Sequence, residues 1–234
     1  MTSQDSLKRD AAAKALEFVR PGMKLGLGTG STAEAFVDLL APLVRDGLDV
    51  TGVATSERTA LKARALGIAL DELDRLAPLD LTVDGADEAD HSLDLIKGAG
   101  AALLREKIVA ASSREMIVIA DESKLVAQLG KFALPVEIIP FGQATTLARI
   151  ARACAALGYR DVKATLRRKD GALVRTDSGN LVCDCAFGAI KDAAALGAAL
   201  SAVTGVVEHG LFIGIATMLI IAHPGRVEII RRTG

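Results

Sequence analysis

The sequence predicts an α/β protein with a mostly parallel, Rossmann-like sheet, helices on both faces, and a smaller inserted α+β domain. Through residue 124, buried apolar runs alternate with amphipathic segments, which is typical of parallel strands joined by helical crossovers. After Gly130 the apolar runs shorten, and Asp170-Gly171 and Ser178-Gly179 are hairpin signals. We therefore expect an α/β domain of residues 1–130 and 206–234 and a small α+β domain of residues 131–205.

The first half of the chain supplies most of the expected parallel sheet. An Ala-rich helix is predicted from Leu7 to Val19, where Pro21 and Gly22 end it. A short strand, 23–27, then leads through the turn GLGTGST (26–32) into a second helix. The remaining strands expected in this half are 50–54, 68–70, 79–83 and 116–120.

The second half combines hairpins with two helices. Helices are predicted at 143–157 and 190–203, and strands at 134–139, 162–168, 173–176 and 181–186. From Val206 we expect the chain to rejoin the first domain, with a strand at 219–222 and a final basic helix around 226–232.

Composition argues against several classes of function. A chain of 234 residues can bury a stable core without disulfides or metal. With 3% aromatic residues and no Trp, it lacks stacking platforms for single-stranded nucleic acid. A net charge of −1, from 28 basic and 29 acidic residues, argues against a nucleic-acid footprint or a polybasic membrane surface.

Cysteine usage and hydropathy indicate the compartment. Cys154, Cys183 and Cys185 form no paired framework, and we expect reduced thiols, with Cys183 and Cys185 on one strand face. The polar start of the chain lacks the apolar core of a secretory signal. The longest apolar run, 211–222, is shorter than the ~20 residues of a membrane helix. We expect a soluble, cytoplasmic protein.

Charged side chains gather between residues 84 and 107. Asp84 and Asp87 follow the apolar run 79–83, and ligands of open α/β sheets bind at such strand ends. Lys97 follows a second apolar run, 93–96, and precedes a small-residue turn and a helix from Ala101 with Glu106 in its second turn. A buried ammonium must be paired, so we expect these groups to converge. Taken singly, Glu106 is equally compatible with an acid on a helix surface.

The turn GLGTGST suits a phosphate. Its glycines are spaced by two, Ser31 replaces the third fingerprint glycine, and no Gly-Lys-Ser/Thr follows, which disfavours the dinucleotide and P-loop motifs. A helix N-terminus with the hydroxyls of Thr29, Ser31 and Thr32 suits a monoester phosphate. A tight turn with a helix cap is the alternative.

The acidic stretch does not predict a metal site. Asp84, Asp87, Asp90 and Asp94 are spaced by three or four residues, unlike the alternating ligands of an EF-hand loop. His209 and His223 have no close ligand partner in the sequence. We expect no metal or cofactor, and a solvated acidic loop for Glu88, Asp90, His91 and Asp94.

Several motifs together resemble the type A ribose-5-phosphate isomerases. They cover nearly the whole chain, and the most specific is DGADE (84–88) followed by KGAGAALLREK (97–107). The others are SLKRDAAAKAL, GLGTGST, IADESK, LPVEIIPFG and GVVEHGLF. The resemblance implies interconversion of D-ribose 5-phosphate and D-ribulose 5-phosphate, a step of the non-oxidative pentose phosphate pathway, through a cis-enediol without a metal.

The resemblance also implies roles for individual residues. Glu106 would be the base that moves a proton between C1 and C2, Asp84 and Lys97 would serve the hydroxyl protons and ring opening, and Asp87 would hold the sugar. Lys8 matches a lysine that we place near the phosphate. The matching substrate-binding residues are Thr29, Gly30, Ser31, Thr32, Gly85, Ala86, Gly98, Ala99, Gly100 and Lys124.

The resemblance further implies a homodimer, possibly a tetramer, with Pro135–Phe141 and Gly205–Phe212 as candidate contacts. Ala99 departs from the family's GGG turn, and its methyl group is harmless unless the residue needs a positive φ. The segment CDCAFGAI (183–190) replaces a more polar strand end. Two alternatives are a sugar-phosphate-sensing module, which would lose Lys97 and Glu106, and an isomerase of amino sugar phosphates.

Overall fold

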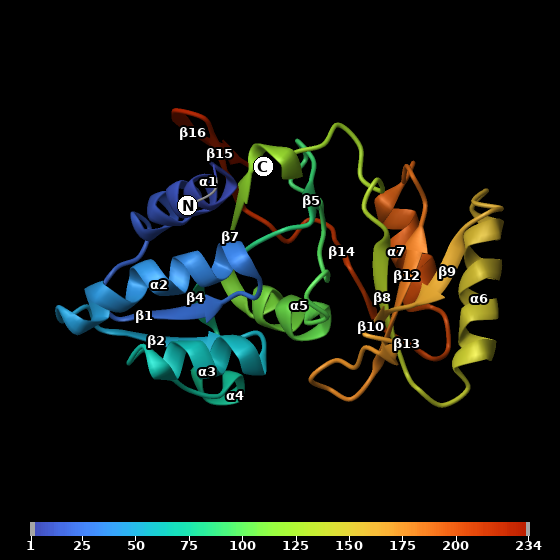
Figure 1. The fold of residues 1–234 in the computed structure, drawn as a ribbon, viewed down its shortest axis with the longest axis horizontal. Helices are drawn as coiled ribbons and strands as arrows, with labels where there is room; N and C mark the ends of the chain where they lie inside the picture. Colours follow the sequence, from blue (N-terminus) through green and yellow to red (C-terminus); the bar gives the residue numbers. More distant parts are fainter. Residues whose placement is uncertain (1–2, 233–234) are drawn as a thin grey trace.

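A seven-stranded sheet forms the centre of the larger part of the computed structural model, which describes residues 3–232 (Figure 1). Every strand pair in this sheet is parallel except the edge pair β15–β16. From edge to edge the strands are β16 (Arg226–Arg231), β15 (Met218–His223), β7 (Ser113–Asp121), β4 (Leu79–Asp84), β1 (Met23–Leu27), β2 (Val50–Ala54) and β3 (Ala69–Leu70). The predicted mostly parallel sheet is confirmed.

Alternating side chains of the central strands supply two cores. Leu81 and Val83 of β4 pack with α1 (Ser3–Leu16) and α2 (Ser31–Arg45) on one face. Met116 and Val118 of β7 pack on the other face with Ala110 of α5 (Leu103–Ala111). Helices therefore cover both faces, as predicted. The connections between β2 and β4 contain α3 (Glu57–Ala65) and α4 (Leu73–Leu76).

A second sheet, antiparallel throughout, lies beside the first (Figure 1). Its strand order is β13 (Val206–His209), β8 (Leu134–Ile138), β12 (Leu181–Ala186) and β9 (Lys163–Leu166). Its core includes residues of α6 (Gln143–Ala156) and α7 (Ala193–Ser201), and the hairpin of β10 (Arg168–Lys169) and β11 (Ala172–Leu173) extends from it. The three cysteines are free and buried, and Cys183 and Cys185 share one strand face, with their sulfur atoms 3.8 Å apart.

A small three-stranded sheet joins these parts. It contains β14 (Leu211–Phe212), β6 (Leu95–Ile96) and β5 (Glu88–Ala89). The chain crosses to the second sheet after β7 and the 3₁₀ turn η1 (Glu122–Lys124), and it returns through β14 (Figure 1). Because β13 still pairs with β8, this return begins after His209, whereas we expected it at residue 206. None of the described helices is long and apolar enough to span a bilayer.

The predicted basic helix at 226–232 is wrong, because this segment is the edge strand β16. Only Pro224 and Gly225 separate it from β15, and Gly225 has a φ of +80°, so the chain reverses in a tight turn and pairs antiparallel. Val227 then packs against the core on one face and Ile230 against the core on the other. The Pro-Gly pair is a turn signal, but the basic composition of the segment that follows it favours the prediction of a helix.

Two predicted boundaries next to the charged stretch shift as well. The expected strand at 93–96 is only β6, because Leu93 has a φ of +62° and lies in a turn. The helix expected from Ala101 begins at Leu103, because Ala101 also has a left-handed backbone, with a φ of +58°. Glu106 is consequently in the first helical turn, closer to the strand ends than predicted.

Candidate active site

A cavity of about 210 Å³ lies at the carboxyl ends of β1 and β4 and extends to α1, α5 and η1. It brings together all ten predicted substrate-binding residues and Asp87, Lys97 and Glu106, while Asp84 is fully buried against Lys97. Two further residues of α1, Gln4 and Lys8, line its opening. The lining residues are Gln4, Lys8, Thr29, Gly30, Ser31, Thr32, Gly85, Ala86, Asp87, Lys97, Gly98, Ala99, Gly100, Glu106 and Lys124.

Asp84 is held at the end of β4 by three donors. Its Oδ1 accepts the N–H groups of Thr29 and Gly85 at 3.0 and 2.7 Å, and its Oδ2 is 3.0 Å from Lys97 Nζ. Gly28 leaves the space for this carboxylate, since a Cβ at that position would lie 2.2 Å from Asp84 Oδ1. A Cβ on Gly26 would similarly meet Thr82. These two glycines of GLGTGST are therefore required for the close approach of β1 and β4.

Lys97 is almost completely buried and lies between two carboxyl groups. Its Nζ is 3.0 Å from Asp84 Oδ2 and 3.3 Å from Glu106 Oε1, and it donates to the carbonyl oxygen of Gly85 at 2.6 Å. Burial opposes its charge, but the carboxylates of Asp84 and Glu106 outweigh burial and raise the pKa of Lys97. The ammonium therefore stays charged.

Glu106 is the less well satisfied of the two carboxyl groups. It is 3% exposed, Lys97 is its one ion-pair partner, and its Oε2 has no hydrogen-bond partner among the described residues. Burial, partly offset by Lys97 and reinforced by Asp84, raises the pKa of Glu106 to about 8. Burial raises the pKa of Asp84 too, but Lys97 and two backbone N–H groups oppose it there. One ammonium faces two buried carboxyl groups, and only Asp84 has backbone N–H donors that also favour its charged form, so Glu106 is the carboxyl group with fewer interactions that stabilise its charge.

Asp87 joins the acidic turn to the small-residue turn after Lys97. Its Oδ2 accepts the N–H of Ala99 at 2.8 Å, and its own N–H donates to Ile96 O at 2.9 Å. Burial raises the pKa of Asp87. Gly98 has a φ of +113°, whereas Ala99 does not have a positive φ. The methyl group of Ala99 is therefore tolerated.

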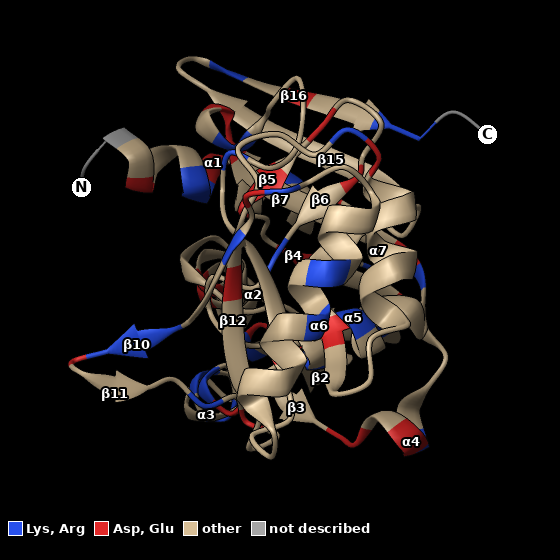
Figure 2. Cartoon of the chain, turned by 90° about the vertical axis from the view of Figure 1, so that its right-hand side faces the viewer, with Lys and Arg blue, Asp and Glu red and all other residues tan. Residues whose placement is uncertain are grey.

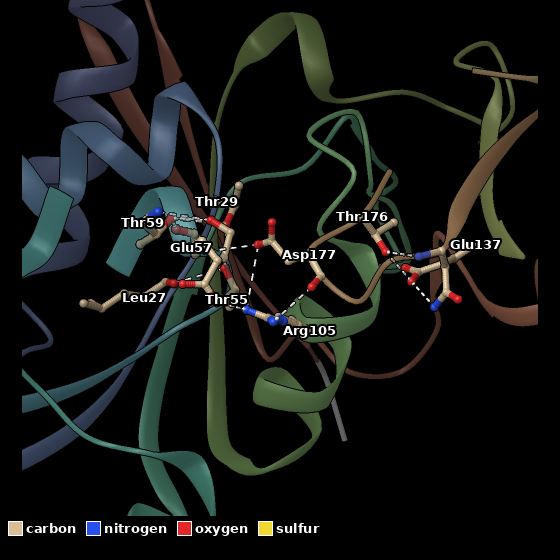
Figure 3. A network of polar contacts seen from close by, with 12 residues as sticks. Leu27, Thr29, Thr55, Glu57, Thr59, Arg105, Glu137, Thr176 and Asp177 are labelled. Atoms are coloured by element: carbon tan, nitrogen blue, oxygen red, sulfur yellow. Dashed lines mark hydrogen bonds and ion pairs between the residues drawn. The ribbon is translucent and has the colours of Figure 1, made fainter. Parts of the chain in front are cut away.

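The loop that begins α2 presents free backbone donors. Gly30 has a φ of +108°, and the N–H groups of Ser31 and Thr32, at the helix N-terminus, have no hydrogen-bond partner within residues 3–232. Thr29 differs from these neighbours. Its hydroxyl is within hydrogen-bond distance of the hydroxyls of Thr55, Ser56 and Thr59 (Figure 3). Its N–H donates to Asp84. Thr29 thus lines the cavity and fixes the loop, with its polar groups engaged by protein.

The prediction for Glu88 is wrong, and several long-range contacts near the cavity were not predicted from the sequence. Glu88, expected in a solvated loop, is buried, and its oxygens accept the N–H groups of Gly130 and Phe132. Figure 3 shows a second link between the sheets, in which Asp177 accepts the N–H of Glu57 at 2.8 Å. Arg105, beside Glu106, pairs with the Glu57 side chain. No local pattern signals these contacts, because 42 to 120 residues separate the partners.

Within the described part of the chain, no three or more His, Cys, Asp or Glu side chains are arranged to hold a metal ion. The cavity instead offers an ammonium, two buried carboxyl groups and a set of backbone N–H donors. Such a set can bind an anion and move protons between neighbouring oxygen and carbon atoms.

Comparisons with known proteins identify the family of the chain. Residues 51–226 match the family model described as ribose 5-phosphate isomerase A (phosphoriboisomerase A). A relative named ribose-5-phosphate isomerase A, from Rhodopseudomonas palustris (strain BisB18), is 57% identical over 230 residues, covering 98% of this chain and 99% of its own. A solved ribose 5-phosphate isomerase from Plasmodium falciparum superposes with a TM-score of 0.93 at 38% identity, covering 98% of this chain and 100% of its own. A D-ribose-5-phosphate isomerase in complex with phospho-erythronic acid superposes with a TM-score of 0.91 at 36% identity, covering 99% and 100%.

Proposed function

Because the chain belongs to the ribose 5-phosphate isomerase A family, we propose that its cavity interconverts D-ribose 5-phosphate and D-ribulose 5-phosphate with Glu106 as the base. The reaction itself follows from the family and from near full-length relatives. The observation that carries the assignment of the base is the buried Glu106 beside Lys97, with a pKa raised to about 8. A base poised near the working pH combines proton affinity with a useful ionised fraction.

In this proposal, ionised Glu106 removes the proton from C2 of the open-chain aldose and returns it to C1. The electron pair moves into a cis-enediolate, and negative charge develops on the carbonyl oxygen. Lys97, held between Asp84 and Glu106, supplies a fixed positive charge for that oxygen. The Lys97–Asp84 pair then transfers the hydroxyl proton between O1 and O2, and it assists opening of the furanose ring.

The remaining lining residues bind the two ends of the sugar phosphate. Asp87 accepts a hydroxyl, and the free N–H groups of Ser31 and Thr32 bind the phosphate at the N-terminus of α2. Lys8 and Lys124 add positive charge at the same opening. The ligand of the solved relative, phospho-erythronic acid, supports this division, since it carries a carboxylate at one end and a phosphate at the other. A planar carboxylate resembles the enediolate in shape and charge.

The Glu106→Gln variant tests the proposal, because the amide keeps the shape of Glu106 but cannot accept the proton. We expect kcat for ketose formation from ribose 5-phosphate to fall about 10³-fold, with a small change in KM. Glu115→Gln is the matched control, since Glu115 is exposed on β7 away from the cavity. Ketose formation by Glu106→Gln at the rate of the control would contradict the assigned base. An inactive wild-type protein would contradict the reaction.

We also propose a cytoplasmic homodimer. The three buried free thiols are compatible with a reducing compartment. Phe141, in the predicted contact segment 135–141, is 92% exposed, and Ile139 beside it is 45% exposed. The other predicted segment, 205–212, is largely buried within the chain, so the first segment is the better contact. Sedimentation of the wild type and of Phe141→Asp tests this, and a wild-type monomer at micromolar concentration would contradict it.

A further inference from the structure

Arg167 connects the second sheet to the turn that follows Lys97. It lies between β9 and β10 with a side chain that is 14% exposed, and its N–H donates to Val182 O at 2.8 Å. Its Nη1 reaches the carbonyl oxygens of Gly98 and Ala99, at 2.8 and 2.9 Å. An arginine of one sheet thus holds the backbone of a turn that lines the cavity beside the other sheet.

Asp184 fixes the orientation of this guanidinium. Its Oδ2 accepts Arg167 Nε at 2.9 Å, and its Oδ1 accepts Nη2. The two parallel hydrogen bonds hold the guanidinium plane, which leaves Nη1 directed at the turn. A lysine cannot reproduce this arrangement, because a single ammonium lacks the planar fork of donors.

The two carbonyl contacts determine where the N–H groups of the turn point. In a trans peptide the C=O and the following N–H point in opposite directions. With the Gly98 carbonyl on Arg167, the N–H of Ala99 is directed to the other side, where it donates to Asp87 Oδ2. With the Ala99 carbonyl on Arg167, the N–H of Gly100 is likewise directed away from Arg167. Gly100 lines the cavity, and its N–H has no hydrogen-bond partner within residues 3–232.

We propose that Arg167 is a positioning residue for the isomerisation. It holds the turn 98–100 so that Asp87 is oriented by Ala99 and the N–H of Gly100 stays free as a donor to an oxygen of the sugar. This inference rests on the proposed function, because it needs an oxygen at the turn on which charge develops. A donor fixed before the reaction requires no reorganisation as that charge forms. Arg167 itself does not line the cavity, so it acts through the turn.

Steady-state kinetics of Arg167→Met and Arg167→Lys test the role. We expect kcat/KM to fall about 10²-fold in Arg167→Met, mainly through kcat, and Arg167→Lys to recover little of the loss. Arg168→Met is the matched control, because the neighbouring Arg168 is exposed and its side chain donates to the carbonyl oxygen of Gly171. Asp184→Asn keeps Arg167 but loosens it, so we expect a smaller loss in the same direction. It also replaces Arg167→Met if that variant does not fold.

Inhibitor binding separates positioning from general damage. In the proposed binding mode, inorganic phosphate would occupy only the loop at α2, whereas the carboxylate end of phospho-erythronic acid would also contact the turn 98–100. We expect the inhibition constant of phospho-erythronic acid to rise about tenfold in Arg167→Met, with that of phosphate unchanged. Equal weakening of both inhibitors, or activity equal to that of Arg168→Met, would overturn the role of Arg167. Those outcomes would leave the proposed function intact if the wild-type protein isomerises ribose 5-phosphate normally.

Discussion

Two lysines ten residues apart, Lys97 buried and Lys107 partly buried, contact the same aromatic ring in two different charge environments. Lys97 Nζ and Lys107 Nζ lie 5.5 and 5.0 Å from the ring centroid of Phe212, which is fully buried. Lys107 donates to Glu208 Oε1 and to the carbonyl oxygen of His209, both at 2.7 Å. Lys97 instead faces two carboxyl groups, those of Asp84 and Glu106.

The difference lies in how completely each cluster is balanced. Lys107 has one carboxylate partner, and burial, only partly opposed by Glu208, lowers its pKa. Burial and the charge of Lys107 lower the pKa of His209 to about 4, so this imidazole is neutral. In the Lys97 cluster one carboxyl group is in excess, and the pKa of Glu106 rises to about 8. The difference in charge balance distinguishes the two clusters, and the excess carboxyl group is the one that we propose as the proton acceptor.

The largest expected effect comes from removing each ammonium in turn. Lys97→Met leaves two carboxyl groups facing each other and removes the charge that stabilises the enediolate, so we expect kcat to fall about 10³-fold. Lys107→Met should keep kcat within a few-fold but lower the free energy of unfolding by about 3 kcal/mol, since Glu208 loses its partner. Isomerase kinetics and urea denaturation of both variants measure the contrast. Similar kinetic losses in the two would remove the distinction.

The sequence predicts the Lys97 cluster better than the Lys107 cluster, for a physical reason. Asp84 follows an apolar strand directly, and parallel strands bring their carboxyl ends to one edge, so the local pattern already places the site. Lys107 and Glu208 are 101 residues apart and meet because α5 lies against β13, which pairs with β8 in the second sheet. No short-range pattern carries that information.

The same limit explains the other differences between prediction and structure. Glu88 has the composition of a surface acid, but it is buried because the chain passes it again at Gly130 and Phe132. Arg167 sits in a basic run, and its contact with Gly98 spans 69 residues. Alternation and turn signals therefore predict the strands and the cavity, whereas the supports of the site depend on long-range packing.

The pH dependence of catalysis should report the excess carboxyl group. Because Glu106 must be ionised to accept a proton and its pKa is raised to about 8, we expect kcat/KM to increase with pH and to level off above pH 8. Asp84→Asn removes the neighbouring carboxylate that helps to raise this pKa. The pH range over which kcat/KM rises should therefore move to lower pH, although kcat/KM itself also falls. Lys107→Met is the control and should leave this pH range unchanged. A flat wild-type profile between pH 6 and 9 would contradict the raised pKa.

The remaining expected effect is on stability, where the excess carboxyl group is a disadvantage. Burial raises the pKa of Glu106 from 4.5, the ordinary value of a glutamate, to about 8 in the folded protein, so between these values the folded state retains a proton that the unfolded state releases. The contribution of Glu106 to the free energy of unfolding is therefore fully present below pH 4.5 and is lost as the pH rises through 8. The loss is at most about 1.4 kcal/mol per pH unit.

Glu106→Gln removes this titration and leaves Lys97 paired with Asp84 alone. We expect the variant to be more stable than the wild type at pH 9 and nearly equal to it at pH 5, as measured by urea denaturation. Glu115→Gln, on the exposed end of β7, should follow the wild type at both pH values. If the free energies of unfolding of Glu106→Gln and the wild type change in parallel with pH, Glu106 is already ionised at low pH. Its cluster would then be charge-balanced in the folded protein, like the cluster around Lys107.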